Sequence, residues 1–247
     1  MRRRRGGGMI SLAVVTATFL MLLFGMPALG PVFAWAFPGV EPPIFRFASF
    51  PRLFLAHAEI VAAASLAATA AALVLGIFVT RPAGREFRAM LGAVAAIGQS
   101  IPPVAVLAIA VPTLGYGAEP IFIALALYGF LPIVANVIAG IEGVPAAVRE
   151  AAEGMGLSPL QILWRIELPL AAPVILAGVR TSVVINIGTA TIGSTVGAVT
   201  LGTPIIDGLV SGKLPYVIEG ASVVGLFAIV TDMAFERIRA RLGARRE

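Results

Sequence analysis

Long apolar runs alternate with short polar connections along this chain. Six of the runs are long enough to cross a bilayer as a helix, which needs about 20 apolar residues. They cover approximately residues 9–36, 53–79, 90–111, 121–141, 172–198 and 216–235. The pattern predicts one all-α membrane domain over residues 1–247, with about six transmembrane helices and one polar stretch, residues 144–169, between the fourth and fifth spans.

The composition supports a membrane location and argues against an enzyme. Of 247 residues, 59% are hydrophobic and 13% charged, more apolar surface than a soluble domain can bury, so lipid must cover the rest. There is no cysteine, and His57 is the single histidine, which argues against a metal site or a proton relay. No Gly-rich phosphate loop ending in Lys-Ser/Thr is present, so we expect the chain neither to bind nor to hydrolyse ATP. We therefore expect no cofactor and no catalytic residues.

The arginines indicate how the chain is oriented. In a six-span arrangement, those of both tails, of the connection after the second span and of residues 144–169 fall on one side, with few basic residues on the other. Basic residues favour the cytoplasmic side, so we expect both termini and residues 144–169 to be cytoplasmic. Because the arginines then act as topology signals, we do not expect nucleic-acid binding despite the formal charge of +5.

Two spans have unusual features. The first follows four arginines and could be a cleaved signal peptide, but its apolar run is longer than a signal core, and Pro31 follows the Ala-Leu-Gly of residues 28–30. We favour an uncleaved signal anchor. The third span contains Gln99-Ser-Ile-Pro-Pro103, which should bend or interrupt its helix.

The polar stretch between the fourth and fifth spans is expected to form two short helices joined by a glycine corner. Gly154 and Gly156 supply permissive backbone positions at the end of the first helix. Ser158 then caps the second helix, with Gln161 placed for a capping box. Pro169 is expected to end it.

The first of these helices has an apolar face of mostly small side chains. The helical spacing puts Val148, Ala151, Ala152 and Met155 on this face. Two interpretations are open for the pattern alone: an amphipathic segment lying on the membrane surface, or a docking surface for a partner that approaches the backbone closely.

Seven residues of the stretch decide between these interpretations. They are Glu150, Ala151 and Ala152, then Gly156, and finally Ile166, Leu168 and Pro169. This spacing resembles the EAA motif of the membrane subunits of binding-protein-dependent ABC importers. In that family the motif forms a coupling helix that docks on a separate cytoplasmic ATPase.

The resemblance implies a fold, a mechanism and partners. We expect the type I ABC importer permease fold, with alternating access driven by ATPase subunits that bind the ATP and dock on the Glu150 helix. The implied partners are two ATPase subunits, an extracytoplasmic substrate-binding protein, a second copy of the permease or a paralogue, and membrane lipid. The implied location is the bacterial inner membrane.

The fifth span is unusually polar. Asn186, Thr189, Thr191 and Ser194 could offer uncharged hydrogen-bonding groups to a translocation pathway. The alternative is that they join helices, as Ser and Thr often do in membranes. No carboxylate lies in the middle of the spans, which argues against proton or sodium coupling through a buried acid.

Four segments resemble the permeases of importers for quaternary-amine osmoprotectants such as glycine betaine and choline. They are residues 99–103, 128–133, 173–181 and 186–192. The chain departs from that branch at residues 197–202, which read Gly-Ala-Val-Thr-Leu-Gly where the branch usually has Gly-Ala-Gly-Gly-Leu-Gly.

Three alternatives remain at this point. The chain could be an importer permease for another small solute, such as an amino acid or a phosphonate. It could be a passive channel, which has no reason to keep the EAA-like stretch. It could also be an intramembrane hydrolase that uses Ser194 with His57, although Gly-Ser-Thr at residues 193–195 is a weak pattern.

Overall fold

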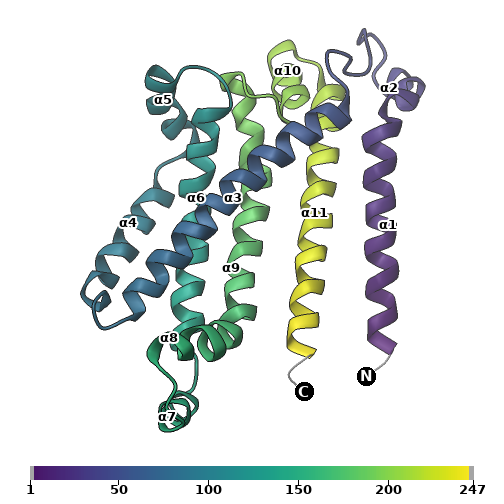
Figure 1. Ribbon diagram of the computed structural model, residues 1–247. Helices are drawn as coiled ribbons and strands as arrows, with labels where there is room; N and C mark the ends of the chain where they lie inside the picture. The colour runs from purple at the N-terminus through teal and green to yellow at the C-terminus, as the bar shows by residue number, and fades with distance from the viewer. Residues whose placement is uncertain (1–2, 245–247) are drawn as a thin grey trace. The chain divides into compact units, whose positions relative to one another are not determined.

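The computed structural model describes residues 3–244, and every regular element in this range is helical (Figure 1). The first half contains α1 (Arg3–Gly25), η1 (Met26–Leu29), α2 (Gly30–Ala36), α3 (Phe50–Thr80), η2 (Arg85–Phe87), α4 (Arg88–Ser100) and α5 (Pro103–Leu114). The second half contains α6 (Ala118–Glu142), α7 (Ala146–Gly154), α8 (Pro159–Ile162), η3 (Leu163–Glu167), α9 (Leu168–Thr189), η4 (Ala190–Val196), α10 (Thr203–Ser211) and α11 (Leu214–Ala244).

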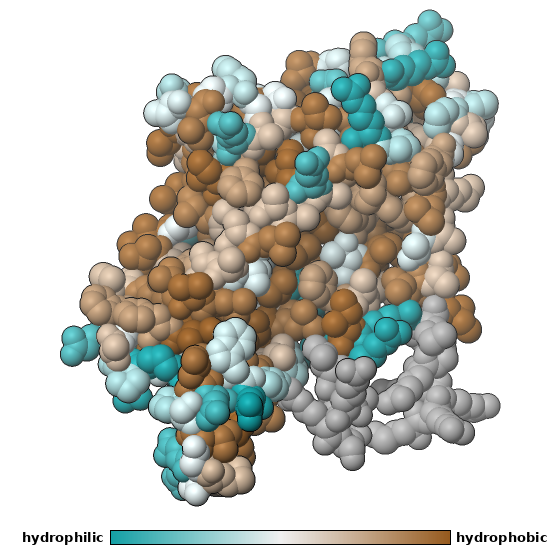
Figure 2. Space-filling view, in the orientation of Figure 1, coloured by the Kyte–Doolittle hydropathy of each residue, from teal (hydrophilic) through white to brown (hydrophobic). Residues whose placement is uncertain are grey.

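The described residues contain five helical segments long and apolar enough to cross a membrane. These are Ile10–Ala36, Phe50–Thr80, Ala118–Glu142, Pro159–Val196 and Leu214–Arg241. The pair α4 and α5 forms a sixth if it counts as one broken span. Apolar residues cover most of the face seen in Figure 2, as a lipid-facing surface requires. The expected all-α membrane fold of about six spans is confirmed.

The third expected span, formed by α4 and α5, is interrupted where its proline pair predicts. Helix α4 ends at Ser100, and Ile101 is extended, with φ −80° and ψ 123°, because a residue that precedes proline avoids the helical region. Helix α5 then begins at Pro103. The Gln99 side chain donates from Nε2 to the Tyr128 carbonyl at 3.0 Å, so it joins two helices.

The chain forms two compact units, which are described separately. One contains the described residues up to 63 together with residues 103–125 and 184–234. The other contains residues 64–102, residues 126–183 and the described residues from 235 onward. We call them the first and the second unit.

In the first unit, the connection between α2 and α3 is tied to the start of α11. The Phe45 N–H donates to both carboxylate oxygens of the buried Glu219, at 3.2 Å each. The Tyr216 hydroxyl donates to the Pro42 carbonyl at 3.2 Å, and Lys213 Nζ donates to the Glu41 carbonyl at 2.7 Å. These contacts order a connection that has no helix of its own.

In the second unit, small residues let the helices approach closely. The buried core consists of Ala68, Ala72, Ala95, Ile133, Val134, Val137, Ile141 and Ala171. A Cβ atom built on Gly178 of α9 would lie 2.7 Å from both the Asn136 Cβ and the Pro132 carbonyl oxygen of α6. Asn136 itself donates from Nδ2 to the Pro132 carbonyl at 2.7 Å. Gly178 therefore permits a backbone contact that no larger residue allows.

Replacing Gly178 tests this packing. Gly178→Ala should lower the thermal unfolding midpoint of the purified protein, because overpacking a tight contact costs about 1–3 kcal/mol. Gly98→Ala is the matched control, since a Cβ there meets nothing within 4 Å. Equal midpoints for the two variants would show that α6 and α9 are not in tight contact at this position.

Candidate functional site

The glycine corner expected after the first short helix is present. Helix α7 ends at Gly154, and Gly156 has a φ of +79°, a conformation that favours glycine. The Gly156 N–H bonds to the Glu153 carbonyl at 2.8 Å, and the Leu157 N–H to the Ala152 carbonyl at 3.1 Å. These two bonds satisfy the last carbonyls of the helix and reverse the chain direction.

The second short helix starts as expected but does not end as expected. Ser158 and Gln161 form the capping box: the Gln161 N–H donates to the Ser158 hydroxyl at 3.4 Å, and the Ser158 N–H to Gln161 Oε1 at 2.8 Å. The prediction that Pro169 ends this helix is wrong. A π-turn over Leu163–Glu167 continues α8 into α9.

The π-turn explains how the helix passes the proline. The Leu168 N–H bonds to the Leu163 carbonyl, five residues back, so this turn is wider than a regular one. Proline has no N–H, and its ring would collide with a carbonyl of a regular preceding turn. The widened turn just before Pro169 accommodates both features.

The motif residues of this segment (residues 144–169) divide between an exposed surface and an inner side. Glu150 and Ala151 are exposed, while Ala152 is fully buried, so the apolar face predicted to contain both alanines is split. Gly156 and Pro169 are also exposed, and Ile166 and Leu168 are half-buried. The exposed large apolar side chains are Val148, Met155, Leu160 and Trp164, with Met155 71% and Trp164 63% exposed. Figure 2 shows apolar and polar residues side by side where α7 and α8 lie in Figure 1.

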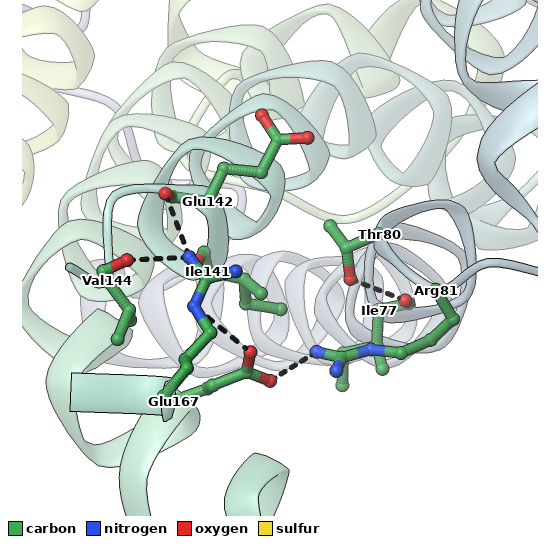
Figure 3. Close-up of polar contacts among 8 residues, drawn as sticks. Ile77, Thr80, Arg81, Ile141, Glu142, Val144 and Glu167 are labelled. Carbon is green, nitrogen blue, oxygen red and sulfur yellow. Dashed lines mark hydrogen bonds and ion pairs between the residues drawn. The ribbon is translucent and has the colours of Figure 1, made fainter. Parts of the chain in front are cut away.

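The inner side of the segment contains a buried carboxylate, Glu167, which is only 3% exposed. Its Oε2 accepts a hydrogen bond from Arg81 Nη2 at 2.5 Å, and Figure 3 shows the two side chains facing each other. Its Oε1 lies 3.7 Å from Arg149 Nε. One carboxylate thus bridges two guanidinium groups that are 29% and 34% exposed.

Arg149 also closes the end of α6. Its Nη2 donates to the Val144 carbonyl at 2.6 Å, with the Glu142 carbonyl at 3.2 Å and the Ile141 carbonyl at 3.4 Å. A cation at the carboxyl end of a helix satisfies unpaired carbonyls and complements the helix dipole.

The bridge therefore connects α7 to the ends of α3, α6 and α9 that lie in the second unit. Arg81 directly follows α3, Arg149 lies on α7 and closes α6, and Glu167 directly precedes α9. Glu167 lies between Ile166 and Leu168 of the EAA-like motif. A charged residue between two apolar motif residues is the one feature of the sequence that could have indicated a buried ion pair here. Sequence reasoning missed the bridge because Arg81 is 86 residues away from Glu167.

The candidate pathway residues lie in the first unit. Asn186 is fully buried, and Thr189 is half-buried. The Thr191 hydroxyl donates to the Gly188 carbonyl at 2.7 Å, within its own helical turn. Ser194 Oγ lies 2.8 Å from Thr200 Oγ1 and 3.2 Å from Thr203 Oγ1. A pathway role for these four residues stays a prediction.

His57 is also in the first unit, and it has a structural role. It is fully buried, its Nε2 lies 3.1 Å from the Ile187 carbonyl, and its Nδ1 accepts from the Leu201 N–H at 3.2 Å. The histidine is therefore the tautomer protonated at Nε2. Because backbone groups engage both ring nitrogens, His57 is not placed as a base for Ser194, and the hydrolase alternative has no support.

Comparison with known proteins decides the family. Residues 72–245 match the family described as binding-protein-dependent transport system inner membrane component. The chain belongs to this family. It is thus a membrane component of a transport system and not an enzyme, as the EAA-like motif predicted.

Named relatives agree with this membership. The osmoprotectant import permease protein OsmY of Salmonella typhimurium is 41% identical over 157 residues, which cover 64% of this chain and 66% of OsmY, just under two thirds. The choline transport system permease protein OpuBB of Bacillus subtilis is 42% identical over 167 residues, covering 65% of this chain and 77% of OpuBB.

A solved structure supports the fold. The chain is similar to a chain in an inward-facing form of the MetNI methionine ABC transporter, with a TM-score of 0.70, 20% identity, and coverage of 78% of this chain and 95% of that one. At this identity the likeness shows the fold, and it confirms the expected ABC importer permease architecture.

Removing the buried carboxylate tests the bridge. Glu167→Gln leaves Arg81 and Arg149, which are 29% and 34% exposed, without their anion, and we expect the free energy of unfolding to fall by about 1.5–3 kcal/mol, because hydrogen bonds to a charged group are lost. Glu142→Gln is the matched control, because its exposed pair with Arg88 should contribute about 0–1 kcal/mol. Chemical denaturation in detergent measures both. A Glu167→Gln loss no larger than that of the control would contradict the bridge.

Proposed function

We propose that this chain is the permease subunit of an ATP-driven importer for quaternary-amine osmoprotectants such as glycine betaine and choline. The observation that carries the proposal is the combination of an EAA-like segment with an exposed apolar surface and a rigid inner attachment. A passive channel needs neither feature. The names of OsmY and OpuBB, an osmoprotectant and a choline permease, support the substrate class.

The surface around Glu150 is the proposed docking site of the ATPase. Met155, Leu160 and Trp164 are exposed, and they flank the glycine corner. Large apolar and aromatic side chains of this kind often dominate the affinity of protein interfaces. The neighbouring carboxylate Glu150 adds a charge that fixes the register of the contact.

The proposal includes further partners, and the family membership supports a binding protein and an ATPase among them. An extracytoplasmic binding protein delivers the solute, and a second permease copy or a paralogue completes the pathway. Each permease docks one ATPase, which binds the ATP. The positive-inside pattern supports cytoplasmic termini and a cytoplasmic Glu150 surface.

Transport in vesicles tests the proposal. We would reconstitute this chain with its ATPase and binding protein, and measure uptake of radiolabelled glycine betaine and choline. ATP-dependent uptake of either solute is the expected result. ATPase activity that the binding protein stimulates without uptake of either solute would retain the importer and reject the substrate class. No stimulation and no uptake would reject the importer.

A substitution on the exposed surface tests the docking site. Met155→Asp should weaken ATPase binding by at least about tenfold, which corresponds to ~1.4 kcal/mol, because a carboxylate replaces an apolar contact. Met155→Leu keeps the apolar surface and should bind normally. Co-purification of the ATPase at graded concentrations measures both. Normal binding by Met155→Asp would place the docking site elsewhere.

A further inference from the structure

The first unit contains an open pocket of about 730 Å³. Its walls come from the N-terminal half of α3, the end of α5, the start of α6 and the segment that follows η4. The volume lies within the range of roughly 300–1,000 Å³ that is typical of small-molecule sites. The lining is mainly apolar, with Ile60, Leu114, Phe122 and Val199 among its side chains.

Two carboxylates are the charged groups of this pocket. Glu59 of α3 and Glu119 of α6 both line it, and its lining contains no basic residue. Neither carboxylate has a hydrogen-bond or ion-pair partner among residues 3–244. Glu119 lies in the first turn of α6, where the helix dipole favours an acid.

The charge of Glu59 is not stabilised by a helix dipole in this way, because Glu59 lies beyond the first turn of its helix. It is the tenth residue of α3, a membrane-spanning helix, and it shares its face with Ala56, Ile60 and Ala63. Glu59 is exposed in the wall of the pocket, and an acidic residue within a membrane-spanning helix marks a candidate functional site.

The chemistry of the lining selects the kind of cation. A small inorganic ion needs several oxygen ligands, and this apolar wall supplies few. An organic cation with a methylated, apolar shell fits better, because its surface can contact Ile60 and Val199 while its charge faces the two carboxylates. Phe122, which is half-buried and lines the pocket, is the aromatic residue available for a cation–π contact.

The wall formed by the segment after η4, which contains Val199, is held in place by His57. This histidine accepts the Leu201 N–H at 3.2 Å and bonds to the Ile187 carbonyl at 3.1 Å. The Ala198 N–H bonds to the Gly193 carbonyl at 3.0 Å, and Gly197 turns the chain with a φ of +82°. The wall that contains Val199 is thus positioned before any ligand binds.

We propose that this pocket binds a quaternary ammonium cation during transport, with Glu59 and Glu119 supplying the opposing charge. The inference rests on the proposed function and refines it. A pocket with two carboxylates and no basic residue favours a ligand with a net positive charge, such as choline, over a zwitterion such as glycine betaine, whose own carboxylate would be repelled.

Direct binding tests the pocket. The complex of this chain with its ATPase, in nanodiscs and without the binding protein, would be titrated with choline. The neutral isostere 3,3-dimethylbutan-1-ol, in which carbon replaces the nitrogen, and the zwitterion glycine betaine would be titrated in parallel. We expect choline to bind at least about tenfold more tightly than either, since the charge supplies much of the affinity.

Substitutions locate the site. Glu59→Gln and Glu119→Gln should each weaken choline binding by about tenfold and lower choline uptake, because each removes one opposing charge. Glu41→Gln is the matched control: Glu41 is an exposed carboxylate of the same unit, outside the pocket, and its substitution should change neither quantity.

The outcomes separate the inference from the proposed function. If the wild-type complex takes up choline, and Glu59→Gln and Glu119→Gln change neither the binding nor the uptake of choline, the pocket is not the choline site. The proposed importer function would still hold in that case. Equal binding of choline and its neutral isostere would overturn the role of the two charges. No saturable binding of choline to the wild-type complex, while ATP-dependent uptake of choline persists, would also overturn the proposal.

Discussion

The carboxylate of Glu167, buried between the guanidinium groups of Arg81 and Arg149, is the constraint on which the segment of residues 144–169 depends. A buried charge without partners is strongly unfavourable, so the three side chains must stay together wherever the segment moves. Their backbone attachments lie at the ends of α3, α6 and α9. The segment is thus fastened to three helices at once, while its outer surface remains exposed for a partner.

This arrangement gives a physical account of how the proposed permease could be coupled to a separate ATPase. A push on the exposed surface can reach the spans only if the segment does not deform on the way. Arg149 prevents fraying at the end of α6, Gly156 sets the corner, and the capping box of Ser158 and Gln161 holds the start of the next helix. The continuous passage from α8 through the π-turn into α9 joins the segment directly to the fifth span.

Local features were predictable from the sequence, and distant contacts were not. The spans, the helix break before Pro103, the turn at Gly156 and the capping box all depend on residues a few positions apart, where backbone preferences decide. The sequence pattern predicts that the helix ends at Pro169, whereas the structure shows that it continues. The π-turn that allows this cannot be predicted from the helix propensities of residues 163–167. The Arg81–Glu167 pair and the pocket around Glu59 join segments far apart in sequence, so only the folded chain brings them together. The roles of Asn186, Thr189, Thr191 and Ser194 still await a functional test.

A distance measurement tests most directly whether the segment moves as one body with its spans. The chain has no cysteine, so spin labels at Ala147→Cys on α7 and Glu86→Cys on η2 would be its only labels, both on exposed positions of the second unit. In the assembled importer, with the labelled chain diluted by unlabelled copies so that only distances within one chain are measured, the account predicts one narrow distance distribution that is unchanged when ATP closes the ATPase and that broadens when Glu167→Gln is added. A wild-type distance that shifts or broadens on ATP binding would show that α7 moves independently of the end of α3, and would contradict the account.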